Sequence, residues 1–306
     1  MQDTSSRPAA PNAAGDAADV RAVPVRHYGR WVAAAAVLFL LAALVRSLIA
    51  NPNLGWPTIR SYLFKDVILQ GLVTTVWLTA AAMALGLLGG TVIAVMRLSR
   101  NPVLSITSGA FVWLFRGTPL LVQILFWGFF GIFYADIQLG VPFTGIVFWS
   151  APTNQVITPM VAALLALGLN EMAYAAEIIR AGIQSVDHGQ TEAAHSLGMS
   201  PLLTMRRVVL PQAMRVIVPP MGNETINMLK TTALVSVISA AEMMTQIQRI
   251  YSQNYQTIPL LIVASVWYLV LTTLLSVPQS YLERRFGRGV TGSGPGVFQR
   301  MIGGTR

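Results

Sequence analysis

The chain has 306 residues, of which 54% are hydrophobic and only 11% are charged, and its mean hydropathy is +0.59. Soluble proteins carry about 25% charged residues, so this composition excludes an ordinary soluble domain and indicates a polytopic membrane protein. The formal net charge of +9 could suit a nucleic-acid-binding protein, but the basic residues gather beside predicted membrane spans, and we expect no nucleic-acid partner.

The first thirty residues are polar and rich in Ala, Pro and Asp, which predicts a disordered tail. They are too long and too mixed for the n-region of a cleaved signal peptide, so the span after them is interpreted as an anchor. Segments long enough to cross the lipid bilayer, about twenty apolar residues each, occur six times. They are Trp31–Ile49, Val67–Met96, Val103–Tyr134, Thr158–Ile179, Val216–Ala241 and Ile258–Leu282. Residues 286–306 are predicted to form a flexible tail. The chain is therefore predicted to be an all-α membrane protein with six transmembrane helices.

The distribution of Lys and Arg predicts the orientation, because cytoplasmic loops are enriched in these residues. With both termini in the cytoplasm, 15 of the 21 basic residues lie on that side. The four that lie outside are Arg46, Arg60, Lys65 and Arg249. The two that lie within spans are Arg116 and Lys230. Both termini, and the loop between the fourth and fifth spans, are predicted to be cytoplasmic.

That loop carries an unusual density of helix start and stop signals. Asp187 with Gln190 predicts a capping box at the start of a short helix, which Gly198 is placed to end. Ser200 is placed as the N-cap of a second short helix, with Pro201 at its first position and Pro211 at its end. A helix pair held at the membrane surface in this way indicates a docking element for a cytoplasmic protein.

Three sequence blocks resemble the permease subunits of bacterial ABC importers. The first block matches the EAA loop of that family at Glu192, Ala193, Ala194, Gly198, Leu210 and Pro211. Val208 stands where the family usually has Ile. Residues 116–123 (RGTPLLVQ) and 177–183 (EIIRAGI) are similar to blocks of the polar amino-acid branch. The resemblance covers about residues 69–285.

The resemblance implies a permease in the bacterial cytoplasmic (inner) membrane that moves a polar amino acid inward. It implies a five-helix core over residues 67–285, a coupling loop over 187–212, and one extra N-terminal helix over 31–50. The implied partners are cytoplasmic ABC ATPase subunits, an extracytoplasmic amino-acid-binding protein, and a second permease subunit, identical or different. The chain has no G-x-x-x-x-G-K-[ST] loop, so we expect ATP hydrolysis on a separate subunit rather than an enzyme site here.

Two other classes of protein remain as alternatives. An ion-coupled secondary transporter would use its intramembrane carboxylates as coupling sites, and a membrane anchor or sensor would transport nothing. The loop favours the permease, since neither alternative requires a cytoplasmic helix pair of this form. The sequence leaves open which amino acid is carried, whether the second permease is identical, and what the extra first helix does.

Ionisable residues inside spans are costly and mark candidate transport pathways. At 1.5 Å per residue, Arg116 and Lys230 lie about 20 Å from the cytoplasmic ends of their spans. Glu171 and Glu224 lie about 10–12 Å from those ends by the same arithmetic. We therefore expect the cations to meet the α-carboxylate of the substrate, and the carboxylates to face its α-ammonium group or act in the inner gate. The structural alternative is that these charges pair with one another.

Other polar residues share helix faces with these charges. Asn223, Asn227 and Lys230 follow i, i+4, i+7 spacing on the fifth span, and Asn170, Tyr174 and Glu177 do the same on the fourth. Glu177 and Arg180 are interpreted as a structural ion pair.

Proline and glycine predict where the spans bend and where they pack. Pro219 and Pro220 should kink or interrupt the fifth span, and Pro119 should break the helix after Arg116. The glycines between Gly86 and Gly90 favour close helix packing over a phosphate site.

No cofactor or metal site is expected on this chain. There is no cysteine, which excludes a disulfide framework and a thiolate metal site. The three histidines lack metal-ligand spacing, and His188 and His195 are interpreted as solvated residues of the cytoplasmic loop.

Overall fold

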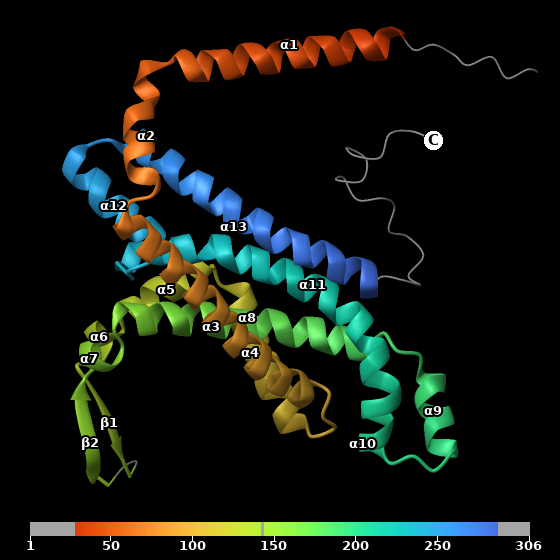
Figure 1. Cartoon of the computed structure of the whole chain (residues 1–306). Coiled ribbons are helices and arrows are strands. Elements are labelled where there is room, and N and C mark those ends of the chain that lie inside the picture. The colour runs from red at the N-terminus through yellow and green to blue at the C-terminus, as the bar shows by residue number, and fades with distance from the viewer. Residues whose placement is uncertain (1–27, 142–143, 287–306) are drawn as a thin grey trace, which may run out of the picture. The chain divides into compact units, whose positions relative to one another are not determined.

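The computed structural model describes residues 28–141 and 144–286 (Figure 1). Of the two predicted tails, residues 1–27 and 287–306 lie outside the described residues. The chain divides into two compact units, residues 1–54 and 55–306. In the first unit, helix α1 (Tyr28–Ala50) coincides with the first predicted span and is followed by a short 3-10 helix, η1 (Pro52–Leu54).

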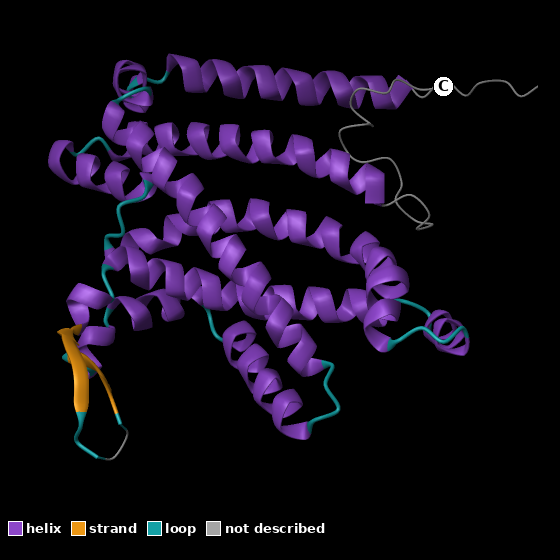
Figure 2. Cartoon of the chain, turned by 60° about the horizontal axis from the view of Figure 1, so that its bottom comes forward, coloured by secondary structure: helices purple, strands orange, loops and turns teal. Residues whose placement is uncertain are grey.

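The second unit is built almost wholly from helices, as predicted (Figure 2). Its α-helices are α2 (Trp56–Leu63), α3 (Asp66–Arg97), α4 (Pro102–Gly117), α5 (Leu120–Gly128), α6 (Phe130–Phe133), α7 (Thr153–Val156), α8 (Pro159–Gln184), α9 (His188–Ser196), α10 (Pro201–Thr204), α11 (Leu210–Thr231), α12 (Met243–Asn254) and α13 (Thr257–Phe286). A π-helix, η2 (Met205–Val209), joins α10 to α11, and a 3-10 helix, η3 (Thr232–Ile238), follows α11. The sequence did not predict the antiparallel hairpin of β1 (Asp136–Gly140) and β2 (Val147–Pro152).

Helix α3 packs closely against α8, and small residues make this possible. A Cβ atom on Gly86 would lie 2.7 Å from the Cβ of Glu171, and one on Gly90 would lie 2.7 Å from the Cβ of Ala175. These glycines therefore serve helix packing, as predicted. Helix α8 starts where Thr158 accepts a hydrogen bond from the Val161 N–H, so its N-terminus is capped.

Four described helices are long and apolar enough to cross a membrane, namely α1, α3, α8 and α13. Helices α4 and α5 together form a fifth candidate, which is bent by 100°. The fifth span predicted from the sequence corresponds to α11 and η3. Helix α11 is less apolar because it carries Arg215, Glu224 and Lys230. The total of six spans therefore stays a prediction.

Helix α11 passes without interruption through Pro219 and Pro220, so these residues do not break the span, and a kink at them stays a prediction. Its α-helix ends instead at Thr231, where η3 begins, and η3 is followed by Ser239 with φ of 59°. Gln279 of α13 supports the proline turn, because its amide donates to the Pro219 carbonyl at 2.8 Å. Neighbouring polar side chains of this kind let membrane helices tolerate internal proline.

Candidate functional site

The predicted coupling loop forms a helix pair, and its first helix is capped at both ends. The Asp187 carboxylate accepts a hydrogen bond from the Gly189 N–H at 2.6 Å. Within the described part of the chain, the reciprocal bond expected from the Gln190 side chain is not formed. At the other end Gly198 adopts φ of 77°, and its N–H donates to the His195 carbonyl at 2.9 Å. The N–H after it donates to the Ala194 carbonyl at 3.1 Å. This pair of bonds is the Schellman motif, so the predicted stop at Gly198 is confirmed.

The second helix of the pair begins as predicted but ends differently. Pro201 is its first residue, and the Ser200 hydroxyl accepts the Leu203 N–H at 3.4 Å. Pro211, however, lies in the first turn of α11 and terminates nothing, because η2 carries the chain from α10 straight into that helix. The first turn of a helix tolerates proline, since an N–H there has no helical partner.

The outer face of this loop is available to a partner. Glu192 and Ala193 are exposed, whereas Ala194 is buried against the loop itself. Among the described residues, the Glu192 carboxylate has no hydrogen-bond or ion-pair partner. Leu197 is 83% exposed and Leu202 is 79% exposed on either side of the Gly198 turn. Exposed leucines on either side of a fixed turn are a surface suited to protein docking.

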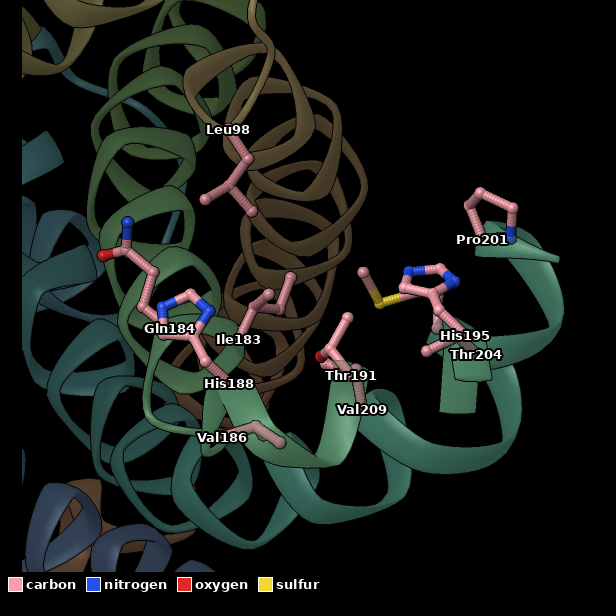
Figure 3. Close-up of a pocket in the computed structure, with 11 residues that line it drawn as sticks. Leu98, Ile183, Gln184, Val186, His188, Thr191, His195, Pro201, Thr204 and Val209 are labelled. Atoms are coloured by element: carbon pink, nitrogen blue, oxygen red, sulfur yellow. The ribbon is translucent and has the colours of Figure 1, made fainter. Parts of the chain in front are cut away.

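A pocket of about 470 Å³ lies inside the helix pair, against the ends of α3 and α8 (Figure 3). His188 and His195 line it from α9 and are exposed, so their interpretation as solvated residues is confirmed. Thr204 lines it from α10, and its buried hydroxyl has no hydrogen-bond partner. Within the described ranges, no three His, Cys, Asp or Glu side chains come together in a way that could hold a metal ion.

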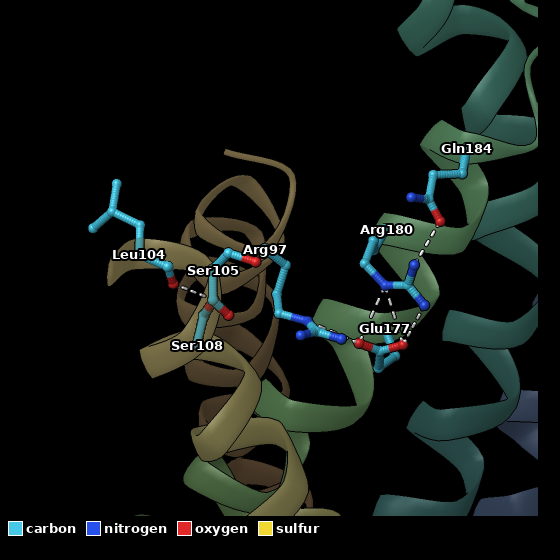
Figure 4. Close-up of polar contacts among 7 residues, drawn as sticks. All are labelled: Arg97, Leu104, Ser105, Ser108, Glu177, Arg180 and Gln184. Carbon is cyan, nitrogen blue, oxygen red and sulfur yellow. Dashed lines mark hydrogen bonds and ion pairs between the residues drawn. The ribbon is translucent and has the colours of Figure 1, made fainter. Parts of the chain in front are cut away.

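An ion network lies about two helical turns before the coupling loop (Figure 4). Arg180 Nη2 lies 2.7 Å from the Glu177 carboxylate, and its Nε donates to both oxygens at 3.2 Å, so the predicted pair is confirmed. Arg180 Nη1 also donates to Gln184 at 2.5 Å. Sequence reasoning missed Arg97 of α3, whose Nε lies 3.5 Å from Glu177. The network therefore ties α3 to the end of α8 that leads into the loop.

The break between α4 and α5 is confirmed, and polar side chains stabilise it. The chain bends by 100° after Gly117, which leaves carbonyl groups without helical donors. Gln123 donates to the Phe115 carbonyl at 2.9 Å and to the Thr118 carbonyl at 3.1 Å. Asn170 of α8 donates to the same Phe115 carbonyl at 2.9 Å. These two amides hold the bend against α8.

Arg116 lies in the last turn of α4 and contacts α8. Its guanidinium lies over the Tyr174 ring, 5.1 Å from the ring centroid. Tyr174 is three residues from Glu171 on α8, which is about 4.5 Å of helical rise. The difference in depth between the two cations and the two carboxylates stays a prediction.

The structure brings together three of the five predicted pathway residues. Glu171 is 2% exposed, and its Oε1 has no hydrogen-bond partner. Glu224 is close enough to repel it electrostatically and to attract Arg116. Asn227 and Lys230 lie on an exposed side of α11, where Asn223 is also exposed, and Lys230 forms no ion pair with any described residue.

The chain can be compared with known proteins on this basis. Residues 86–288 match the family described as binding-protein-dependent transport system inner membrane component. The arginine transport system permease protein ArgU of Corynebacterium glutamicum is 46% identical over 292 residues, which cover 95% of this chain and 90% of that protein. The glutamate/aspartate import permease protein GltK of Escherichia coli is 37% identical over 218 residues, covering 71% and 92%. The ArgU alignment covers 292 of the 306 residues, so it must include at least part of the 23-residue helix α1. The GltK alignment is short enough to leave α1 out.

Solved structures show the same fold. The crystal structure of an amino acid ABC transporter with histidines is 39% identical, with a TM-score of 0.59, and the match covers 72% of this chain and 94% of that one. The MetNI methionine ABC transporter in an inward-facing conformation is 19% identical with a TM-score of 0.55, which supports the fold alone. The family match over residues 86–288 covers most of the chain and includes the EAA-like loop and the bent helix. This chain therefore belongs to the family of binding-protein-dependent transport system inner membrane components.

Proposed function

We propose that this permease subunit imports a polar amino acid with a cationic side chain, arginine being the favoured example. The observation that carries the proposal is 46% identity to an arginine permease along 95% of the chain. The pair of carboxylates inside the helices supports it, since carboxylates bind guanidinium and ammonium groups. An ion-coupled secondary transporter is not favoured, because the relatives are permeases of ABC importers.

The substrate would meet the charges gathered along α8. Arg116 is available to the α-carboxylate, because it forms no ion pair with a described residue and is held over Tyr174. Glu171 and Glu224 repel each other, so a cationic group between them would stabilise both. Glu171 also has a buried oxygen without a hydrogen-bond partner, which a guanidinium or ammonium donor would satisfy.

Asn227 and Lys230 complete the proposed pathway from α11. Their exposed side cannot face lipid without a large cost, because charged side chains in hydrocarbon are strongly unfavourable. A second permease subunit placed against α11 would enclose this side and leave a water-filled route between the two subunits. Lys230 would then attract the α-carboxylate along the route.

The coupling loop would dock on a cytoplasmic ABC ATPase subunit. Exposed Leu197 and Leu202 would enter the interface beside Glu192, while Gly198 fixes the turn between them. Leu210 and Pro211 would direct α11 from the loop back towards the membrane. The chain itself has no phosphate-binding loop, so ATP is hydrolysed on the partner, and no cofactor is required on this chain.

The remaining assignments follow the same scheme. Both termini and the coupling loop lie in the cytoplasm, and an extracytoplasmic binding protein delivers the amino acid to the opposite surface. The permease core spans residues 67–285, and residues 31–50 add one helix in front of it.

The test is uptake by the reconstituted complex of permease, ATPase and binding protein in vesicles. We expect inward transport of labelled arginine but not of glutamate, and weaker apparent affinity in Glu171→Gln and Lys230→Met. Asp66→Asn is the control, because Asp66 is an exposed carboxylate in the first turn of α3. Wild-type apparent affinity in both test variants would show that these charges are structural, and transport of glutamate in place of arginine would refute the proposed cargo.

A further inference from the structure

The β1–β2 hairpin projects from the helices, and most of its length is exposed and packs against none of the helices in the described part of the chain. Its base is fixed where the Thr153 N–H donates to the Ala135 carbonyl at 2.9 Å and the Thr153 hydroxyl donates to the Tyr134 carbonyl at 2.5 Å. In both views the hairpin runs across the direction of α8 rather than along it (Figures 1 and 2). A two-stranded hairpin alone is marginally stable in water, so a surface that covers one of its faces would stabilise it.

The register gives the hairpin one apolar face. Residues directly opposite in antiparallel strands share a face, and Ile137 pairs with Ala151 while Leu139 pairs with Trp149. The register shifts between Leu139 and Gly140, so Val147 pairs with Gly140 and lies on the opposite face. Leu139 is 61% exposed and Trp149 is 44% exposed, whereas Ile137 and Ala151 at the base are partly buried. The apolar face therefore continues from the body of the protein into an exposed surface.

The opposite face carries the polar side chains of the hairpin. These are Asp136, Gln138 and Ser150, with Pro152 at the base and Val147 at the tip, while exposed Phe148 lies at the register shift. Asp136 is the only charged residue in either strand and lies at the base. The hairpin therefore has one wholly apolar face and is nearly uncharged, which suits a boundary between water and an apolar phase better than a solvated loop.

The hairpin lies at the end of α8 remote from the coupling loop. It precedes the N-terminus of α8, and the loop follows its C-terminus, about 39 Å away for 26 residues. Aromatic side chains lead into it from α5 and α6, with contacts that join Phe126, Trp127, Phe130, Phe133 and Tyr134. Such aromatic groups mark the interface between membrane and water. The hairpin begins two residues after this cluster, at the depth of the interface.

We propose that the β1–β2 hairpin lies along the membrane surface, with the face of Leu139 and Trp149 in the lipid headgroup region. The aromatic cluster sets the depth, the crosswise direction keeps the strands parallel to the bilayer plane, and the uncharged face fits the interface. The hairpin then anchors the end of the broken helix next to the substrate route. Its assignment to the outer surface rests on the proposed orientation, but its contact with lipid does not.

The chain contains no cysteine, so single cysteines give unique sites for a polarity-sensitive dye. Trp149→Cys and Leu139→Cys place the dye on the apolar face, and Gln138→Cys and Ser150→Cys place it on the opposite face. Each labelled, full-length permease is placed in phosphatidylcholine nanodiscs with and without lipids that carry a quencher on the upper acyl chain. We expect a blue-shifted emission and at least twofold quenching at 139 and 149, and neither effect at 138 and 150.

Equal quenching on both faces, or no quenching at 139 and 149, would overturn the proposal. Two positions on each face keep this conclusion independent of one disruptive substitution. If the binding protein abolishes quenching at 139 and 149, the face is a protein-docking surface instead and the lipid assignment is wrong. In intact cells, reaction of the position 150 cysteine with a membrane-impermeant thiol reagent separately reports the side of the membrane, so an inverted orientation is recognised by itself.

Discussion

Replacing Gly198 with alanine tests the coupling loop through its backbone alone. Gly198 has φ of 77°, and no neighbouring atom lies within 4 Å of the position that a Cβ would occupy. Alanine therefore creates no clash, and its whole effect comes from the left-handed conformation that it disfavours. The turn also holds the two hydrogen bonds that end α9, from the N–H groups of Gly198 and Met199.

The size of the effect follows from that conformational cost. A left-handed conformation costs a non-glycine residue about 1–2 kcal/mol. This energy lowers the equilibrium constant for the docking-competent loop by about 5- to 30-fold, and the apparent affinity for a partner falls by up to the same factor. Asparagine tolerates this conformation better than alanine, so we expect ATPase affinity to decrease in the order Gly198, Gly198→Asn, Gly198→Ala.

The measurement is a titration of fluorescently labelled ATPase against permease in nanodiscs, with arginine uptake by the full complex as a second measurement. Gly145→Ala is a matched control, because Gly145 has φ of 74° and also has no atom within 4 Å of its Cβ position. It carries the same backbone cost at the other end of α8 and should leave ATPase affinity unchanged. Wild-type affinity in Gly198→Ala, or an equal loss in both variants, would refute the docking role of this turn.

Three further changes test other parts of the structure. Glu177→Gln should lower the free energy of unfolding by about 1–3 kcal/mol, because hydrogen bonds from Arg180 to a charged acceptor are lost. Thermal unfolding measures this loss. If Arg97→Gln lowers the stability of the Glu177→Gln variant as much as it lowers that of the wild type, Arg97 and Glu177 do not form one network. Gly90→Val should cost about 1–3 kcal/mol by overpacking the α3–α8 contact. Gly117→Ala, with no neighbour near its Cβ position, should leave thermal unfolding unchanged, and equal stability of the two variants would contradict the tight contact. A phosphatase reporter that works only outside the cytoplasm should be active when fused near Gln155 and inactive near His195, and the reverse pattern would invert the proposed orientation.

The sequence by itself determined the features that depend on neighbouring residues. Apolar segments of sufficient length predicted a helical membrane protein, and the family resemblance placed the permease core. Gly198 was correctly assigned as a helix stop, and Glu177 with Arg180 as an ion pair, because a cap and an i, i+3 pair involve residues within one turn. Signals of this range can be read without knowing which helix lies beside which.

Tertiary structure decided which helices pack together and which side-chain contacts form between them. Pro119 predicted a break, but only the contact of Asn170 with the Phe115 carbonyl shows how the 100° bend is supported. Arg116 of α4 lies over Tyr174 of α8, a contact between two helices that spacing along one span could not predict. Arg97 joined Glu177 from a helix 80 residues away in the chain for the same reason. Pro219 and Pro220 do not interrupt α11, because Gln279 of α13 donates a hydrogen bond to the Pro219 carbonyl. Such outcomes depend on groups brought together from distant parts of the chain, and helix propensity and spacing contain no information about those partners.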